Sequence, residues 1–427
     1  MRINSLEVFT NDEKKDKIIE VALGDSTSYN TNYNLVIGEN GSGKSRYLKY
    51  IQDIFNYLEK FQANPKKDKC NMSFILSYTI GEDTYLINKK DSETELKRNN
   101  EQINIDKIKL PSNVIAVSFL VSDKFLFSKN DKGIYKYIGV REAANNTYTK
   151  SVFRKLTRNI LIAIQKGRQN DINKVLEQLG FEKNYIKVHF FDIFSEDNEH
   201  KKVEKIPSSV NVLRDFVAES KIPVLLDSSK TSYDEVQLKR NGRLVEVSQL
   251  SSGELHLLFS MVGILAYIED DSLILVDEPE ISLHPEWQVS YISRIKDLFN
   301  KYNSCCFVIA SHSHYLVSDM PPENSSVVIF RKDKKNHSYI STEVVPYSTY
   351  AWSAENILYN VFGMRTTRNY YFERDLEKLL DAIEDENKLD INIAKEKLIK
   401  LKNYVLSNDD PLIDVLEEAE EYINVHA

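Results

Sequence analysis

Short apolar runs separated by polar stretches dominate the first third of the chain. Residues 35–37 and 114–119 are apolar runs, which are typical of strands buried on both faces of a sheet. Residues 18–23 and 72–87 predict further strands, whereas the polar residues 88–107 are typical of a surface loop. The pattern therefore predicts a sheet whose strands are joined by exposed connections.

Helical spacing dominates later in the chain. Apolar residues recur every four positions at Val152, Leu156, Ile160 and Ile164, which predicts a helical segment through residue 180. Residues 188–191 and 236–238 predict short strands, and the chain after Val345 is expected to be helical. The apolar stripes expected in that last region are Leu376, Leu379, Leu380 and Ile383 in one helix and Leu412, Leu416, Ala419 and Ile423 in another.

A glycine loop follows the apolar run 35–37 and precedes a predicted helix. It consists of Gly38, Glu39, Asn40, Gly41, Ser42, Gly43, Lys44 and Ser45. Its glycines allow backbone N–H groups to converge on a phosphate chain at a helix N-terminus. We expect Lys44 to reach the β- and γ-phosphates and Ser45 to hold Mg²⁺. Taken alone, the pattern also fits a glycine-rich turn that opens a helix.

Three later segments favour the phosphate-binding interpretation. Ser251, Ser252, Gly253 and Glu254 precede a helical run, where N–H groups and hydroxyls can meet an anion. Residues 273–276 predict a buried strand that delivers Asp277 and Glu278 to its carboxyl edge. A second buried strand, residues 305–310, leads to His312. We expect Asp277 to hold Mg²⁺ through water, and Glu278 and His312 to orient the attacking water.

Composition changes this picture little. The chain has 427 residues, 42% of them hydrophobic and 28% charged, as in ordinary globular proteins. No apolar run approaches the roughly 20 residues that span a bilayer, and Cys70, Cys305 and Cys306 form no disulfide framework. No signal peptide is evident, so we expect a cytoplasmic protein.

Charge is unevenly distributed along the chain. Residues 373–427 contain 16 Asp or Glu and 7 Lys or Arg, a local balance of −9, which leaves +1 for the rest of the total of −8. The acidic end is either a solvated helical face or a surface for a partner. Lys150, Arg154, Lys155 and Arg158 accompany the predicted helix near residue 156 and fit either a solvated face or a DNA-binding face.

The order of these motifs resembles the heads of ABC-type ATPases, the group that includes RecF, SMC proteins, the zinc-hook repair ATPases and the overcoming-lysogenisation ATPases. The glycine loop matches Walker A, residues 250–254 the signature, 273–278 Walker B, 281–285 the D-loop and His312 the switch histidine. The resemblance implies an α/β P-loop NTPase of ABC-ATPase head type with an inserted mixed, mostly helical lobe and C-terminal helices. It also implies that Ser251, Ser252, Gly253 and Glu254 contact ATP held by a second copy.

The chain departs from the family pattern at two places. No glutamine follows the run 114–119, and Asp123 is a weak candidate for its replacement. The roughly 200 residues between the glycine loop and the signature hold no cysteine pair and no sustained heptads, which argues for a compact lobe. The expected divisions are an N-terminal ATPase lobe at 1–127, the inserted lobe at 128–235, a C-terminal ATPase lobe at 236–349 and an acidic helical region at 350–427.

The arrangement is similar to standalone ATPase subunits of bacterial anti-phage systems such as Septu and PARIS. About 115 residues follow His312, and they show no nuclease motif; residues 408–411 are typical of a turn. The resemblance implies a slow, regulatory ATPase that forms a homodimer or higher oligomer around ATP and Mg²⁺ and controls a separately encoded effector, expected to be a nuclease. The alternatives are a RecF-like maintenance ATPase that acts directly on DNA, and a scaffold that binds ATP without turnover.

Overall fold

The computed structural model describes residues 1–10, 16–23, 30–65, 70, 72–91, 93–120, 123–127, 133–141, 148–191, 209–214, 232–332, 339–363, 369–384, 391–404 and 412–426. The turn expected at 408–411 and the side chain of Lys150 lie outside the described residues. The chain forms two compact units, Met1–Ala354 and Glu355–Ala427.

The first unit is built on a large mixed sheet. Within the described ranges, 13 strands pair in the order β7-β6-β5-β4-β1-β2-β17-β16-β3-β15-β14-β8-β9. Six successive strands of this order pair in parallel: β16 (Ser325–Lys332), β3 (Asn32–Gly38), β15 (Cys306–Ser311), β14 (Leu273–Asp277), β8 (Val114–Ser118) and β9 (Tyr135–Gly139). The mainly antiparallel flank contains β17 (Ile340–Val344), β2 (Lys17–Ala22), β1 (Arg2–Phe9), β4 (Ser73–Ile80), β5 (Asp83–Lys90), β6 (Glu93–Arg98) and β7 (Glu101–Gln102).

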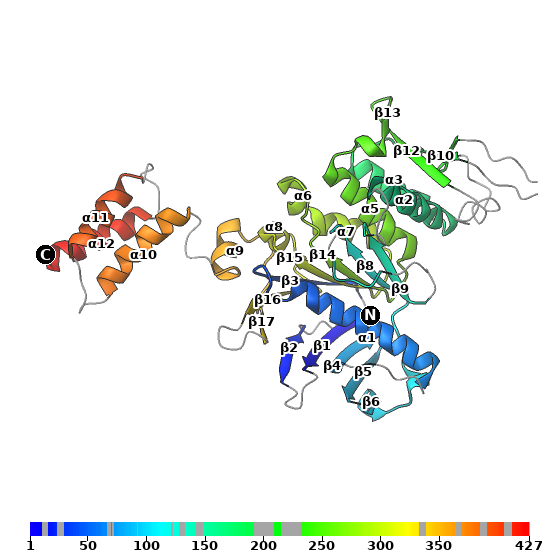
Figure 1. The fold of residues 1–427 in the computed structure, drawn as a ribbon, viewed down its shortest axis with the longest axis horizontal. Coiled ribbons are helices and arrows are strands. Elements are labelled where there is room, and N and C mark those ends of the chain that lie inside the picture. Colours follow the sequence, from blue (N-terminus) through cyan, green and yellow to red (C-terminus); the bar gives the residue numbers. More distant parts are fainter. Residues whose placement is uncertain are drawn as a thin grey trace, which may run out of the picture. The chain divides into compact units, whose positions relative to one another are not determined.

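One long helix, α1 (Lys44–Ala63), packs on one side of this sheet (Figure 1). It shares a continuous apolar core with the antiparallel strands and with alternate residues of the parallel strands, such as Leu273 and Leu275 of β14. Ile274 and Val276 point to the other face because successive side chains of a strand alternate, and they are buried there too. Burial on both faces explains the continuous apolar runs in the sequence.

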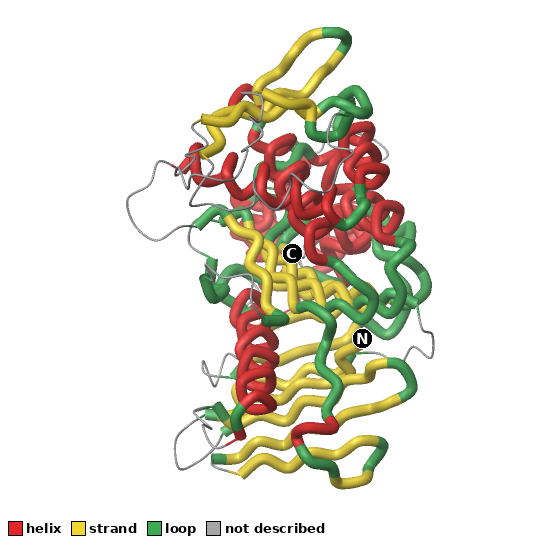
Figure 2. The backbone as a smooth tube through the Cα atoms, turned by 90° about the vertical axis from the view of Figure 1, so that its right-hand side faces the viewer, coloured by secondary structure: helices red, strands yellow, loops and turns green. Residues whose placement is uncertain are grey.

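Several helices cover the opposite face, as Figures 1 and 2 show. They are α2 (Tyr148–Gln165), α3 (Gln169–Gln178), α5 (Ser252–Tyr267), α6 (Pro285–Val289), α7 (Tyr291–Phe299) and α8 (His314–Ser318). The stripe from Val152 to Ile164 is buried in α2, which confirms a helix over these residues. The continuous helical segment expected through residue 180 is wrong in part, because Gly167 with φ +73° separates α2 from α3. Helix α5 lies directly on β9, because a Cβ placed at Gly263 would come within 2.4 Å of Ile138 Cγ2.

A small second sheet has the order β11-β10-β12-β13. Its strands are β10 (Ile186–Phe191), β11 (Ser209–Asn211), β12 (Ser232–Arg240) and β13 (Arg243–Glu246). Strands β10 and β12 contain the two short runs predicted at 188–191 and 236–238, and both are longer than expected. This sheet leads directly into the segment that precedes α5.

The loop expected at residues 88–107 is wrong in part. Strands β5, β6 and β7 occupy much of this range and extend the antiparallel flank. Leu96 is the buried apolar residue of β6. Backbone hydrogen bonds to the neighbouring strands define a polar strand near the end of a sheet. Its sequence therefore lacks the apolar alternation from which a strand can be predicted.

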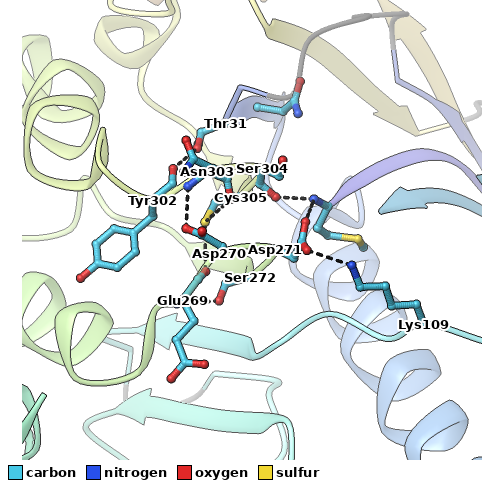
Figure 3. Close-up of polar contacts among 12 residues, drawn as sticks. Thr31, Lys109, Glu269, Asp270, Asp271, Ser272, Tyr302, Asn303, Ser304 and Cys305 are labelled. Atoms are coloured by element: carbon cyan, nitrogen blue, oxygen red, sulfur yellow. Dashed lines mark hydrogen bonds and ion pairs between the residues drawn. The ribbon is translucent and has the colours of Figure 1, made fainter. Parts of the chain in front are cut away.

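Polar contacts hold the amino edge of the parallel strands (Figure 3). Asp271 Oδ2 accepts a hydrogen bond from Lys109 Nζ at 3.3 Å, and Asp270 Oδ1 accepts one from the Asn303 amide at 2.8 Å. The Thr31 hydroxyl donates to the Tyr302 carbonyl at 3.0 Å. These contacts join the segments that enter β3, β14 and β15. They therefore help to fix the strands' relative position at the edge opposite the candidate site.

The second unit is helical. After α9 (Ala354–Asn360), the helices α10 (Tyr370–Glu384), α11 (Ile391–Lys402) and α12 (Leu412–His426) pack together. Their buried residues are Phe372, Leu379, Ala394, Leu398, Leu401, Leu416, Ala419 and Ile423. Both predicted stripes are present, but Leu380 is 37% exposed and lies off its stripe. Leu376, Leu379 and Ile383 follow the helical repeat, and Leu380 lies about 100° around the helix from Leu379. None of the described helices is long and apolar enough to cross a membrane.

Adjacent leucines of α10 provide a test of this packing. We expect Leu379→Ala to lower the free energy of unfolding of the helical unit by about 2–5 kcal/mol, because it removes a fully buried side chain. Leu380→Ala is the matched control and should cost less than about 1 kcal/mol. Calorimetry of the full chain measures both; equal losses for the two variants would contradict the packing described.

Candidate functional site

The backbone of the glycine loop packs closely against β16 and β17. It joins β3, whose residues are all buried, to α1. A Cβ placed at Gly38 would come within 2.2 Å of the Phe330 carbonyl oxygen of β16, and one at Gly43 within 2.2 Å of Ile340 Cδ1. Gly43 also has φ +102°, a conformation that L side chains rarely adopt. The loop thus requires glycine at these two positions.

Lys44 is the buried cation of the loop, with 3% of its surface exposed. Its Nζ donates to the carbonyl oxygens of Gly38 at 2.9 Å and Glu39 at 3.2 Å, and lies 2.8 Å from His312 Nε2. Burial lowers the pKa of Lys44 to about 8, against the opposing effect of nearby carboxylates, chiefly that of Glu278. The lysine is thus directed into the space where the loop, β14 and β15 end.

Ser45, in the first turn of α1, meets Asp277 at the end of β14. The Ser45 hydroxyl donates to Asp277 Oδ1 at 2.9 Å. Burial raises the pKa of Asp277 to about 6; the Ser45 hydroxyl opposes the rise, and the charges of Glu278 and Asp123 add to it. A hydroxyl beside a buried carboxylate supplies the hard oxygen ligands that Mg²⁺ prefers.

Glu278 follows Asp277 with φ +51°, in the left-handed region. Its Oε1 lies 3.7 Å from His312 Nε2. The pKa of Glu278 is lowered, first by the hydrogen bond with His312 and then by the charges of His312, Lys44 and Lys124, while burial opposes the change. Glu278 is therefore ionised near neutral pH, as a group that orients or deprotonates water must be.

Glu280 also belongs to this site, because it contacts the backbone of His312, although no motif in the sequence marks it. Its Oε1 accepts a hydrogen bond from the His312 amide at 2.5 Å. Burial raises the pKa of Glu280. The only signal in the sequence was a third acid two positions after Glu278, beyond the strand-breaking Pro279. Glu280 holds the backbone that presents His312.

The signature segment caps α5 at a different place. Ser251 is the N-cap and forms a capping box with Glu254, in which the Ser251 amide donates to Glu254 Oε2 at 2.9 Å. Ser251 and Ser252 are exposed, and Gly253 is buried. A Cβ at Gly253 would come within 2.7 Å of the Ser282 carbonyl oxygen. In the described part of the chain, no hydrogen bond or ion pair joins residues 251–254 to the glycine loop.

Glu254 is held by two partners. Its Oε1 pairs with Arg240 of β12, and its other oxygen is bonded by Ser251. Burial would raise the pKa of Glu254, but the hydrogen bonds from Arg240 and Ser251 outweigh it and lower the pKa overall. The last residue of the signature is thus part of a structural network that joins α5 to the small sheet.

Asp123 lies in the segment where the resemblance predicts a glutamine. Its Oδ2 accepts a hydrogen bond from the Tyr137 hydroxyl at 2.5 Å, and its Oδ1 accepts one from the Phe125 amide at 2.9 Å. Arg141 Nη1 lies 3.7 Å from Oδ1, and burial raises the pKa of Asp123. The carboxylate therefore faces the protein interior and anchors the loop after β8. Among the described residues, no group of three or more His, Cys, Asp or Glu side chains is arranged to hold a metal ion.

These features define a P-loop ATPase of the α/β class, as the sequence predicted. The chain belongs to the family described as "AAA domain, putative AbiEii toxin, Type IV TA system", whose model matches residues 33–318.

Known relatives extend over different parts of the chain. It is 22% identical over 413 residues to Septu protein PtuA of Bacillus thuringiensis, covering 91% of this chain and 92% of the relative. It is 24% identical over 267 residues to protein ea59 of Escherichia phage lambda, covering 60% of this chain and 46% of that relative. The predicted likeness to a Septu-type ATPase is thus confirmed.

Solved structures to which the chain is similar include SMC heads. An SMC head bound to the C-winged helix domain of ScpA is 12% identical, with a TM-score of 0.44, covering 81% of this chain and 98% of that one. The SMC head domain from Thermotoga maritima is also 12% identical, with a TM-score of 0.41, covering 81% and 99%.

Two glycines with positive φ allow a test of the loop. We expect Gly43→Ala to weaken the binding of a fluorescent ATP analogue at least about tenfold, because the new methyl group meets Ile340 and the backbone is strained. Gly81→Ala is the control: Gly81 has φ +61° in the β4–β5 turn and nothing within 4 Å of an added Cβ. Its affinity should equal that of the wild type. Unchanged binding by the Gly43 variant would disprove the assignment of the loop.

Proposed function

We propose that this protein binds ATP with Mg²⁺ and hydrolyses it slowly in a site completed by a second copy of the chain. The state of that site controls a separate effector, a nuclease, in anti-phage defence in the cytoplasm. The main observation is the convergence of Lys44, Ser45, Asp277, Glu278 and His312 at one sheet edge, while the signature segment lies apart with its serines exposed.

The residues present fit ATP and Mg²⁺. Gly38 and Gly43 keep the loop backbone close to its neighbours, and the buried Ser42 hydroxyl has no hydrogen-bond partner among the described atoms. Lys44 is a buried donor of the kind that binds phosphate oxygens. Ser45 and Asp277 supply oxygen ligands, and bound Mg²⁺ would neutralise charge on the phosphates.

The catalytic roles follow from position and charge. Glu278 is ionised and can accept a proton from, or orient, an attacking water. His312 lies between Lys44 and Glu278 and can hydrogen-bond to the transferred group. Catalysis of this kind is mainly positioning and charge stabilisation, so the preorganised contacts of Glu280 matter as much as the groups that touch substrate.

A second copy is needed because the signature does not reach the glycine loop of its own chain. Ser251, Ser252 and the first amides of α5 form an exposed helix N-terminus, which favours anions. In a head-to-tail dimer Ser251, Ser252 and Gly253 would contact the γ-phosphate held by the other copy, and Glu254 would support them by holding the cap of α5. Two sites would then form and open together, which suits a switch.

The effector is inferred from the relatives. The likeness to Septu protein PtuA extends over nine-tenths of both chains. The resemblance to ATPase subunits of anti-phage systems implies a separately encoded partner. The described residues of the second unit form an acidic helical body, and Tyr370, Tyr371 and Tyr404 are exposed on it. These features suit a protein partner better than a nucleic acid.

Direct action on DNA has less structural support. Lys155 donates to the carbonyl oxygens of Gly139 and Arg141, both at 2.8 Å, so it faces the protein. Arg158 is half-buried and Arg154 is exposed. The basic cluster in the sequence is therefore not a continuous exposed stripe along α2 in the described residues.

Glu278→Gln tests the catalytic assignment. We expect hydrolysis to fall at least about 100-fold, because the amide cannot accept the proton, while ATP still binds. Glu269→Gln is the matched control, because Glu269 is exposed and precedes β14 at the edge opposite Glu278. This substitution should leave the rate of hydrolysis unchanged. Phosphate release measures the rate of both variants. An unchanged rate for Glu278→Gln would contradict the catalytic role of Glu278.

The same variant tests the partner. Purified from its host with ATP and Mg²⁺, the trapped Glu278→Gln protein should retain the effector, which mass spectrometry identifies. Recovery of DNA with no protein partner would contradict the effector proposal and favour the DNA-binding alternative.

Ser252→Arg tests the shared site. In the Glu278→Gln background it should abolish ATP-dependent dimerisation, because a bulky cation at the exposed start of α5 blocks the opposing surface. Binding of the fluorescent ATP analogue to the single chain should change by less than about twofold, since the glycine loop is untouched. Sedimentation velocity measures the dimer. Persistence of an ATP-dependent dimer in the double variant would refute the head-to-tail arrangement.

A further inference from the structure

His256 lies where three segments of the first unit meet. It is in the second turn of α5, and its side chain is almost fully buried. Its Nδ1 is 2.9 Å from the Ile281 carbonyl oxygen, and its ring stacks on Phe119 with centroids 4.5 Å apart and planes 15° apart. Phe119 directly follows β8. Ile281 lies in the loop formed by residues 278–284, between β14 and α6.

The contact with Ile281 fixes the state of the imidazole. A carbonyl oxygen only accepts hydrogen bonds, so Nδ1 must carry the proton and donate. Burial lowers the pKa of His256 to about 4, against the opposing effect of the Ile281 carbonyl. At neutral pH the ring is therefore uncharged, and it acts as a permanent donor rather than a titrating group.

The 278–284 loop is held from two sides. On one side His256 bonds to Ile281, and the Ser282 carbonyl lies so close to Gly253 that a Cβ there would be 2.7 Å away. On the other side Glu280 accepts a hydrogen bond from the His312 amide at 2.5 Å. The loop begins with Glu278. A continuous set of contacts thus joins the start of α5 to both proposed catalytic residues.

We propose that His256 is a positioning residue that couples the signature segment to Glu278 and His312 of the same chain. This inference rests on the proposed function, in which the signature contacts the nucleotide held by the other copy. A shift of α5 on that contact moves the His256 donor and, through Ile281, the loop that presents Glu278. Hydrolysis in one site therefore depends on occupancy of the other.

Two substitutions separate the two contacts of the ring. His256→Phe keeps an aromatic ring on Phe119 and removes the donor. His256→Asn places an amide nitrogen near the position of Nδ1 and removes the ring. Ser260→Ala is the matched control, because the Ser260 hydroxyl is buried one turn later in α5 and bonds to carbonyl oxygens of the same helix, His256 at 2.7 Å and Leu257 at 3.3 Å.

We expect the Phe variant to lose about tenfold in kcat, since it leaves the Ile281 carbonyl without its donor. Its affinity for the fluorescent ATP analogue should stay within about twofold of the wild type, because the glycine loop is intact. The dependence of rate on ATP should lose its cooperativity. The Asn variant should recover most of the rate and the cooperativity, and Ser260→Ala should match the wild type.

Hydrogen exchange supplies a readout that does not need turnover. In the Glu278→Gln background, ATP should protect the amides of residues 279–284, and His256→Phe should remove that protection while His256→Asn keeps it. If the Phe variant retains kcat, cooperativity and protection, the inference is wrong. If the Phe and Asn variants lose rate equally and both unfold at lower temperature, the role is only structural. If the wild type neither hydrolyses ATP nor dimerises, the proposed function fails. Faster exchange of residues 279–284 in His256→Phe than in the wild type, both without ATP, would then still show that His256 holds the loop, and equal exchange would refute it.

Discussion

The in-register parallel pairing of β3, β15, β14 and β8 is the constraint on which the site depends. Asp277 is opposite Ala310 of β15 and Ser118 of β8, and Ala310 is opposite Val36 of β3. The glycine loop, the carboxylates and His312 therefore begin at the same level of one edge. A slip of one residue would turn every side chain of a strand to the other face. Because both faces are packed, such a slip is excluded.

Lys44 and Asp277 are buried at this edge without forming a matched ion pair with each other. Burial lowers the pKa of Lys44 to about 8 and raises that of Asp277 to about 6, so both shift toward their neutral forms. A well-matched ion pair would shift both groups the other way. A phosphate chain at Lys44 and a divalent cation at Asp277 would each favour the charged form. The electrostatics thus agree with the proposed ligand better than with a role in stability.

Residues at the ends of buried strands could be predicted from the sequence. Gly38, Asp277 and His312 each follow an apolar run, and parallel strands bring such ends together. It missed Glu280 and His256, because their roles depend on a backbone amide and a carbonyl that no side-chain pattern encodes. It also missed β6, whose polar strand is defined by pairing, and it placed Leu380 in a stripe that the actual helix rotation excludes. Features that produce a pattern of buried apolar residues could therefore be predicted from the sequence. Features that depend on tertiary hydrogen bonds could not.

Glu254 shows how the signature can respond to the rest of its own chain. Its carboxylate binds Arg240 of β12 and the amide of Ser251, so the small sheet and the cap of α5 share one acid. His256, two residues further along α5, joins the same helix to the 278–284 loop. In the proposed mechanism, a movement of β12 would therefore reach the exposed serines through Glu254 and the loop that presents Glu278 through His256. The small sheet is thus attached to α5 at the point where an input from the proposed partner would bear on both halves of the proposed shared site.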